Sequence, residues 1–262
     1  MACSLHIFLN NKLLSTDDFG INDLISDQRV NRTCETLTEL GFEVLLVGRS
    51  LKKSLPLKPR TYQTQRMNLV FEKGALFYAE YNIRLFLFLL FKKFQILHSN
   101  DLDTLLANRL VQKMKGGELV YDSHEYFTEV PELVGRKAQK AWLFIERLIF
   151  PKLKHVFTVN ESISNIYNKL YGKDVKIMRN VPISNKFKSS ATPKSKSDLG
   201  LPSDKKVILL QGAGINLDRG AEEMVEAMQW IDAVFLIVGT GDVIEPLKKR
   251  VLELKLSEKV IF

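Results

Sequence analysis

Short apolar runs alternate with stretches of helical periodicity along most of this chain, and this alternation constrains the fold more than any other feature. The runs Phe42–Val47 and Leu119–Tyr121, for example, have the length and composition of buried strands. Strands that alternate with helices in this way form parallel sheets, because each parallel connection needs a helical crossover. The sequence therefore predicts an α/β fold in which helices cover both faces of a parallel sheet.

The same pattern gives the expected elements in chain order. The expected strands are Leu5–Leu9, Phe42–Val47, Phe94–Leu97, Leu119–Tyr121, His155–Val159, Val175–Met178, Val207–Leu210, Ala233–Val238 and Lys259–Phe262. The expected helices are Ser26–Leu40, Leu76–Lys92, Asp101–Met114, Lys137–Phe150, Glu161–Tyr171, Arg219–Trp230 and Val243–Leu254. Ser26 or Asp27 is the expected N-cap of the first helix, and Gly172 is the expected stop of the fifth.

One segment rich in Lys, Ser and Pro, Lys186–Ser203, interrupts the alternation and has the composition of a linker. We therefore predict an N-terminal domain at residues 1–185, a linker at 186–204 and a second domain at 205–262. The second domain offers about three strands and two helices, which is few for an independent α/β sheet. We expect it to be incomplete and the chain to be a fragment or to end early.

The composition excludes several classes of protein. The hydrophobic fraction of 45% supports a sizeable core, so the chain is not expected to be disordered. The two cysteines, Cys3 and Cys34, form no metal-ligand cluster, which argues for a reducing compartment without a disulfide framework or a zinc site. The net charge of +8 favours anionic partners, but no nucleic-acid-binding motif accompanies it.

A strongly apolar run, Leu85–Phe91, lies between Arg84 and the pair Lys92 and Lys93. It is far shorter than the roughly 20 residues that a membrane-spanning helix needs. We expect a helix that is buried or that partly seeks a membrane surface.

The most chemically suggestive segment follows the strand Leu119–Tyr121. Asp122, Ser123, His124 and Glu125 come directly after it. Ligands of open α/β sheets bind beyond the carboxyl ends of the strands, so these side chains are candidates for a site. The alternative is that the acidic groups only cap a helix and that the histidine is an ordinary loop residue. A glycosidase-type acid pair among Asp122, Glu125, Glu129 and Glu132 would depend on a separation in space that the sequence does not give.

Two glycine-containing turns in the second domain are candidates for phosphate binding. The first contains Gly212 and Gly214 and leads to Arg219 and Gly220, and the second contains Gly239 and Gly241. Glycines let a backbone approach a phosphate closely, helix N-termini attract anions, and a guanidinium can bind a phosphate with two hydrogen bonds. An ordinary turn between strand and helix is the alternative.

These turns do not match the common nucleotide-binding motifs. Leu217 stands where G-x-G-x-x-G requires its third glycine, which disfavours a dinucleotide site, and no P-loop motif occurs.

Together the segments resemble family 4 (group 1) glycosyltransferases of the two-domain GT-B fold, in the bacterial subgroup that carries a YDSHEYF segment. The resemblance covers nearly the whole chain. The matching segments are Ser26–Val30, Asn100–Asp103, Val120–Phe127, Val130–Leu133, Phe150–Leu153, Thr158–Ser162, Arg179–Pro182, Gln211–Gly214, Asp218–Gly220 and Val238–Asp242.

The resemblance implies two Rossmann-like domains, the first for the acceptor and the second for a nucleotide-sugar donor, with transfer in the cleft between them. His124 matches the family histidine that reaches the donor sugar. Arg219 stands where the family usually has a lysine beside the donor pyrophosphate, and Ala213 stands where an accompanying arginine is common. The glycines Gly212, Gly214, Gly220, Gly239 and Gly241 are implied to lie against the donor. Further residues expected in the cleft are Arg29, Asp101, Asp122, Glu125 and Asn180.

The implied reaction transfers a sugar to a glycan or lipid-linked acceptor, with retention of configuration and without a metal or other cofactor. It implies a role in cell-surface polysaccharide synthesis, in the cytoplasm or at the inner face of an anionic membrane. The resemblance places the family's E-x7-E segment downstream of Phe262, so we expect weak donor binding. Other GT-B chemistry, such as nucleotide-sugar epimerisation or phosphorolysis, and a binding module without activity remain as alternatives.

Overall fold

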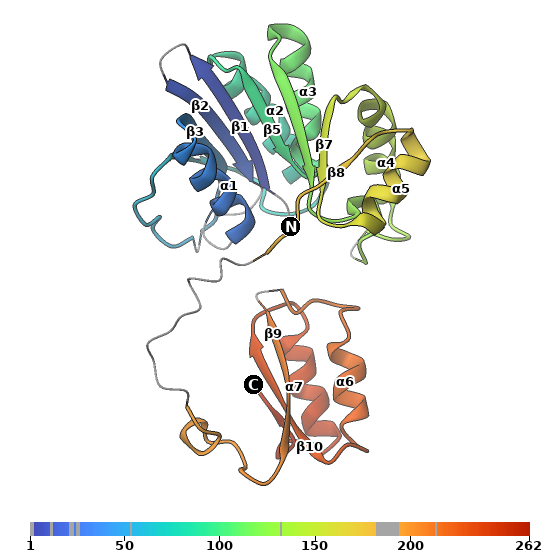
Figure 1. Ribbon diagram of the computed structural model, residues 1–262. Coiled ribbons are helices and arrows are strands. Elements are labelled where there is room, and N and C mark those ends of the chain that lie inside the picture. The colour runs from blue at the N-terminus through green and yellow to red at the C-terminus, as the bar shows by residue number, and fades with distance from the viewer. Residues whose placement is uncertain are drawn as a thin grey trace. The chain divides into compact units, whose positions relative to one another are not determined.

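The structure is a computed structural model that describes residues 3–10, 13–20, 24, 27–52, 54–131, 133–181, 194–212 and 214–262 (Figure 1). Residues 1–181 and 182–262 form two compact units. The first twelve residues of the second unit, 182–193, lie outside the described residues and include part of the predicted linker. Each unit is described by itself below.

The first unit is built on one sheet, which comprises eight strands in the described part of the chain. Their order is β4-β3-β1-β2-β5-β6-β7-β8, with additional pairing of β3 with β2 and of β1 with β5. The strands are β1 (Cys3–Asn10), β2 (Leu13–Gly20), β3 (Phe42–Ser50), β4 (Gln63–Asn68), β5 (Ile96–Asn100), β6 (Glu118–Ser123), β7 (His155–Thr158) and β8 (Lys176–Ile177). From β5 to β8 every neighbouring pair is parallel, as the sequence predicts.

The first strand departs from the prediction of a parallel sheet. β1 runs antiparallel to β2, β3 and β5. The reason is local, because Asn10 of β1 pairs with Leu13 of β2, and two strands joined so closely can only pair antiparallel. β2 then pairs parallel with both β3 and β5.

Two strands, β2 and β4, were not predicted. β4 consists mainly of polar residues and forms an edge of the sheet, where its side chains are exposed or half-buried. An edge strand therefore needs no apolar run, which is the signal on which the prediction depended.

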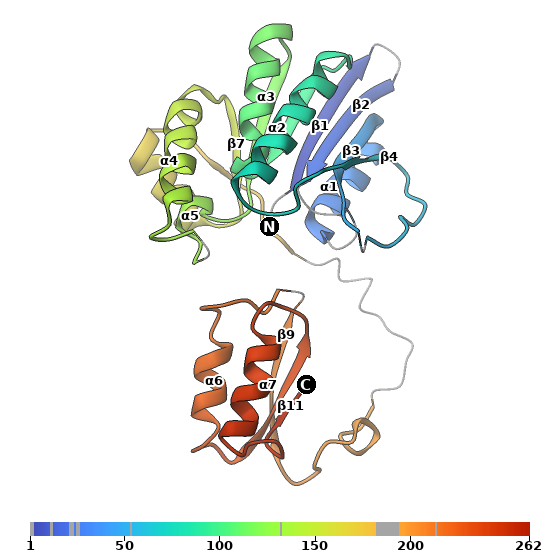
Figure 2. The same ribbon diagram turned by 180° about the vertical axis from the view of Figure 1, so that it is seen from behind.

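Helices cover the two faces of this sheet. Figure 1 shows α1 in front of the strands, and Figure 2, from behind, shows α2 and α3 on the opposite face. The helices are α1 (Gln28–Glu39), α2 (Gly74–Leu90), α3 (Leu102–Lys115), α4 (Lys137–Ile149) and α5 (Glu161–Tyr171), with short 3₁₀ turns η1 (Phe127–Glu129) and η2 (Phe150–Lys152). Leu89 of α2, Leu105 of α3 and Tyr121 of β6 belong to one fully buried core, and Val30 and Cys34 of α1 belong to a second.

The predicted helix ends are largely confirmed. The carboxylate of Asp27 accepts a hydrogen bond from the backbone N–H of Val30 (3.0 Å) and caps α1. α5 has the predicted bounds, and Gly172 ends it in the left-handed conformation.

The second unit is a parallel sheet with the strand order β11-β10-β9. Figures 1 and 2 show α6 and α7 on the same face of this sheet. The prediction that helices cover both faces therefore does not hold among its described residues. The elements are β9 (Lys206–Gly212), α6 (Ala221–Ala227), β10 (Ala233–Gly239), α7 (Ile244–Glu253) and β11 (Val260–Ile261), preceded by a 3₁₀ turn η4 (Ser197–Leu199). The helices bury Val225 and Leu247 against Phe235, whereas Leu209 of β9 and Val238 of β10 are about half exposed.

No helix of the described residues is both long enough and apolar enough to cross a bilayer.

Candidate functional site

The carboxyl ends of β5 and β6 lie side by side in the first unit, with Asn100 opposite Asp122. Just beyond them, the backbone N–H of Asp101 donates to the carbonyl of Asp122 (2.9 Å). The backbone N–H of His124 donates in turn to the Asp101 carboxylate (2.8 Å). These bonds bring the predicted residues Asp101, Asp122 and His124 together at one point on the edge of the sheet.

The imidazole of His124 lies between two carboxylates. Its Nε2 is 3.2 Å from Oδ2 of Asp122, a hydrogen bond, and its Nδ1 is 3.6 Å from Oδ2 of Asp101. The His124 side chain is 15% exposed, whereas those of Asp101 and Asp122 are almost completely buried. Histidine is therefore the member of this group that a ligand can reach.

Arg29 brings α1 to the same point. Its guanidinium donates to both carboxylate oxygens of Asp122, with Nη2 at 2.7 Å from Oδ1 and 2.8 Å from Oδ2. Its Nη1 donates to the carbonyl of Met178, just after β8 (2.7 Å). A bidentate, buried pair of this kind fixes the orientation of the carboxylate as well as its charge. We refer to Arg29, Asp101, Asp122 and His124 as the His124 cluster.

The charges in the cluster shift the pKa values of its members. Burial alone would lower the pKa of His124, but the charges of Asp101 and Asp122 and the hydrogen bond to Asp122 outweigh it and raise the pKa to about 9. Burial likewise favours protonated Asp122, but His124 and Arg29 hold its pKa below the ordinary value. Around neutral pH the cluster thus contains an imidazolium hydrogen-bonded to a carboxylate.

Asp101 differs from Asp122 in two respects. Burial raises its pKa to about 6, and the charge of His124 and the hydrogen bond from its backbone N–H only partly oppose this rise. Its backbone has φ 59° and ψ 173°, a conformation that is strained for any residue other than glycine. The bonds to Asp122 and His124 hold it in this conformation.

His98 lies close to the cluster and was not among the predicted residues. It is buried in β5, and neither ring nitrogen has a hydrogen-bond partner among the described residues. Burial lowers its pKa to about 3, although the charge of Asp122 acts in the opposite direction. The alternation of β5 could have indicated it, because His98 and Asn100 share one face of the strand.

Two predicted residues lie beside the cluster without joining it. The backbone carbonyl of Glu125 accepts from the Ser123 hydroxyl (2.7 Å), but no hydrogen bond to the Glu125 carboxylate occurs among the described residues. The side-chain oxygen of Asn180 accepts a hydrogen bond from Arg32 of α1. Glu125 and Asn180 therefore take no direct part in the ion pairs of the His124 cluster.

The glycosidase-type acid pair finds no support in the geometry. Both Asp122 carboxylate oxygens are bonded to Arg29, and a Glu129 oxygen accepts from Gln139 (3.2 Å), while Glu132 lies outside the described residues. In the described part of the chain, no group of three or more His, Cys, Asp or Glu side chains could hold a metal ion.

In the second unit, Arg219 and Gly220 precede a short helix. Both are exposed, and α6 begins only at Ala221, two residues later than predicted, after Gly220 with φ 85°. The first turn of α6 carries Glu222 and Glu223, which oppose the attraction of a helix N-terminus for anions. The role of Arg219 as the ligand of a donor phosphate stays a prediction.

The glycines of the two turns have a packing role that the sequence did not reveal. A Cβ on Gly239 would lie 1.8 Å from the carbonyl oxygen of Gly212, and one on Gly241 would lie 1.9 Å from that of Ile215. The backbone N–H of Ile215 also donates to the carbonyl of Thr240 (2.9 Å). Both glycines are thus required for close contact between the turns. Gly212 and Gly239 moreover end β9 and β10 rather than lying in the turns.

Comparisons with known proteins give a consistent classification. Among solved structures, the chain is similar to sucrose-phosphate synthase of Thermosynechococcus elongatus (TM-score 0.64, 14% identity), covering 89% of this chain and 63% of that one. It is also similar to HepE of Anabaena, solved with UDP and glucose (TM-score 0.58, 14% identity), covering 83% of this chain and 60% of that one. A glycosyltransferase of Rickettsia africae is similar as well (TM-score 0.53, 16% identity), with 91% of this chain and 65% of that one covered. The chain thus spans less than two thirds of the length of these proteins, and the likeness is one of fold, that of GT-B glycosyltransferases.

No curated protein matches the sequence. The model of the family described as Glycosyltransferase Family 4, however, matches residues 27–181, which is more than half of the chain and includes the whole His124 cluster. The chain therefore belongs to Glycosyltransferase Family 4.

Proposed function

We propose that this protein transfers a sugar from a nucleotide-sugar donor to a glycan or lipid-linked acceptor. The observation that supports this most strongly is the His124 imidazolium, which is partly exposed at the carboxyl edge of the sheet and held by Asp101 and Asp122. Membership of Glycosyltransferase Family 4 supports the same reaction class.

The raised pKa of His124 determines what its side chain does. An imidazole with a pKa of about 9 is protonated at neutral pH and is a poor general base. Its Nδ1 lies 3.6 Å from Oδ2 of Asp101, an ion-pair contact that is longer than a hydrogen bond, and in the proposal its N–H donates to the ligand. In the proposed reaction this group binds a hydroxyl of the donor sugar and orients it.

The leaving group in this reaction is a nucleoside diphosphate, and its negative charge grows as the sugar–phosphate bond breaks. In the proposal, Arg219 and the backbone N–H groups of its turn bind the pyrophosphate. A positioned donor of this kind contributes about 3 to 4 kcal/mol to transition-state stabilisation. We propose further that the anomeric configuration is retained and that no metal is needed, as the sequence resemblance implies.

Contact with an anionic membrane from the cytoplasmic side is part of the proposal. Lys115 donates to the carbonyls of Leu89 and Leu90, so the C-terminal ends of α2 and α3 adjoin. The ends of the two helices carry exposed apolar and cationic residues, namely Leu87, Phe91, Leu110, Met114, Lys92, Lys93 and Lys113. Exposed apolar side chains accompanied by cationic ones favour anionic lipid surfaces.

Vesicle flotation tests this contact. We expect the chain to float with vesicles containing phosphatidylglycerol at low salt and not with pure phosphatidylcholine, and we expect Phe91→Ser to reduce the floated fraction. Equal flotation with both lipids, or none with either, would exclude an electrostatic membrane contact. We propose that the transfer serves cell-surface polysaccharide synthesis, as the resemblance to the bacterial subgroup implies.

The transfer reaction itself is tested by incubating the chain with UDP-glucose, UDP-galactose, UDP-N-acetylglucosamine and GDP-mannose. Release of the nucleoside diphosphate, increased by a glycan acceptor and accompanied by a glycoside of the donor's configuration, is expected for one of them. Conversion of the donor sugar without an acceptor would indicate epimerisation. Binding of a nucleoside diphosphate without any turnover would instead favour a binding module.

A further inference from the structure

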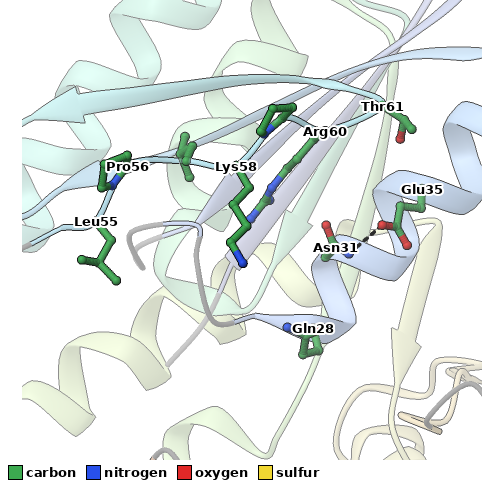
Figure 3. A pocket seen from close by; sticks show the side chains of 10 residues that line it. Gln28, Asn31, Glu35, Leu55, Pro56, Lys58, Arg60 and Thr61 are labelled. Atoms are coloured by element: carbon green, nitrogen blue, oxygen red, sulfur yellow. Dashed lines mark hydrogen bonds between the residues drawn. The ribbon is translucent and has the colours of Figure 1, made fainter. Parts of the chain in front are cut away.

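A pocket of about 530 Å³ lies between α1 and the segment 55–61, outside the His124 cluster (Figure 3). Gln28 lines this pocket, whereas the next residue, Arg29, holds Asp122. The pocket and the cluster therefore flank the same first turn of α1. The lining residues are Gln28, Asn31, Glu35, Leu55, Pro56, Leu57, Lys58, Pro59, Arg60 and Thr61.

Part of the pocket is fixed by a chain of hydrogen bonds. Arg60 Nη1 donates to the hydroxyl of Tyr62 (2.6 Å), which donates to the Asn31 side-chain oxygen (2.6 Å). The Asn31 amide then donates to Glu35 (2.9 Å), as Figure 3 shows. The guanidinium of Arg60 also lies 5.5 Å from the ring centre of Tyr62. A ligand would therefore meet polar groups that are already oriented.

Three other polar groups of the lining are not used by the fold. The amide of Gln28, the ammonium of Lys58 and the hydroxyl of Thr61 make no hydrogen bond or ion pair among the described residues. Beside them, Leu55 and Pro56 provide an apolar surface. The pocket thus combines available donors and acceptors with carbon surface.

This combination suits a sugar better than a nucleotide. Amide, hydroxyl and ammonium groups bind sugar hydroxyls, and apolar side chains pack against the C–H faces of a sugar ring. No aromatic ring is among the described lining residues, and the Arg60 guanidinium, which could stack on a nucleobase, is already hydrogen-bonded to Tyr62. The lining contains two cationic side chains, Lys58 and Arg60, and one anionic side chain, Glu35, so it also suits a sugar that carries a carboxylate.

We propose that this pocket binds a saccharide unit of the acceptor, with Lys58, Thr61 and Gln28 contacting its hydroxyls. That the saccharide is the acceptor rests on the proposed function, whereas the binding of a saccharide does not. The proposal assigns a ligand to a segment that lies outside the expected strands and helices.

Saturation-transfer NMR on the whole chain tests the binding. The probes are the methyl glycosides of glucose, galactose, N-acetylglucosamine and glucuronate at millimolar concentration. We expect saturation of at least one probe, reduced at least threefold by the double substitution Lys58→Ala and Thr61→Ala. Lys52→Ala is the matched control, because Lys52 is an exposed lysine close by in the chain that does not line the pocket. Saturation of no probe, or equal saturation of the double variant, would overturn the proposal.

A second measurement separates this proposal from the transfer reaction. Release of nucleoside diphosphate from a nucleotide-sugar in the absence of acceptor should be the same in the double variant and in the unchanged chain, since none of the residues assigned to the donor lines the pocket. If acceptor-dependent release is also unaffected by the double substitution, the pocket is not the acceptor site, although transfer stands. If the chain releases no nucleoside diphosphate at all, the proposed function fails, but saccharide binding in the pocket does not.

Discussion

The guanidinium of Arg29 contacts both carboxylate oxygens of Asp122, at 2.7 and 2.8 Å, although 93 residues separate the two in sequence. The same guanidinium also binds the carbonyl of Met178. One side chain therefore links α1, the end of β6 and the segment after β8. The orientation of the Asp122 carboxylate, and through it that of His124, depends on this link.

Arg29→Ala should destabilise the first unit by about 3 to 5 kcal/mol, because it removes the guanidinium that bonds both oxygens of the buried Asp122 carboxylate. Urea unfolding followed by circular dichroism measures this change. Arg32→Ala is the matched control: Arg32 lies on the same helix and bonds to the exposed Asn180, so its loss should cost less than about 1 kcal/mol. Equal effects of the two substitutions would show that the buried ion pair is not important for stability.

His124 should titrate with a pKa of about 9, far above 6.5, in an NMR titration of its ring proton. Since the folded state binds the proton more tightly, this group adds stability that is complete below pH 6.5 and is lost as the pH rises through about 9. Asp122→Asn should lower the pKa, because it removes one of the two carboxylate charges. A His124 pKa at or below 6.5 in the unchanged chain would contradict the proposed imidazolium.

The sequence predicts local features of the fold better than long-range ones. The Asp27 cap, one of two predicted candidates, and the predicted end of α5 at Gly172 depend on neighbouring residues, and the structure has both. The strand β4 was missed because an edge strand need not be apolar. His124 was recognised through a family segment, but its two carboxylate contacts come from β6 and from the end of β5, and sequence spacing does not give such distances.

The glycine turns illustrate the same limit. Gly239 was expected to lie against a donor phosphate, and only the tertiary structure shows that its missing side chain makes room for the carbonyl of Gly212. The pocket beside α1 was missed for a related reason. Lys58 and Arg60 are polar loop residues in sequence, and their relation to Asn31 arises only in the folded unit.

Gly239→Ala should destabilise the second unit by more than about 2 kcal/mol, because the new Cβ would clash with backbone and because φ is 147° there. Gly214→Ala is the matched control in the neighbouring turn. Its Cβ would have no heavy atom closer than 3.8 Å, so its cost should stay below about 1 kcal/mol. Thermal unfolding of both variants measures the difference. A Gly239→Ala variant as stable as Gly214→Ala would refute the close contact of the turns.

Glu146 offers a prediction about pH. Burial raises its pKa to about 7, Tyr171 donates to its Oε1 (2.5 Å), and its Oε2 has no partner among the described residues. The folded state therefore binds this proton more tightly than the unfolded state, and stability falls as the pH rises from about 4.5 to 7.

Glu146→Gln should remove that loss and keep an acceptor for Tyr171, stabilising the chain by on the order of 2 to 3 kcal/mol at pH 8 and by little at pH 4. Urea unfolding at the two pH values measures this. The exposed Glu39→Gln should change stability by less than about 0.5 kcal/mol at either pH. A destabilised Glu146→Gln variant at pH 8 would mean that the buried carboxylate has a partner that stabilises its charge.

The central claim is that His124 acts on the donor sugar, and turnover of the nucleotide-sugar tests it most directly. With the donor that the chain uses best, His124→Ala should release nucleoside diphosphate at least tenfold more slowly while its circular dichroism spectrum shows a folded chain. His155→Ala, which removes an exposed histidine of β7, should turn over like the unchanged chain. Equal turnover by His124→Ala and the unchanged chain would contradict the account.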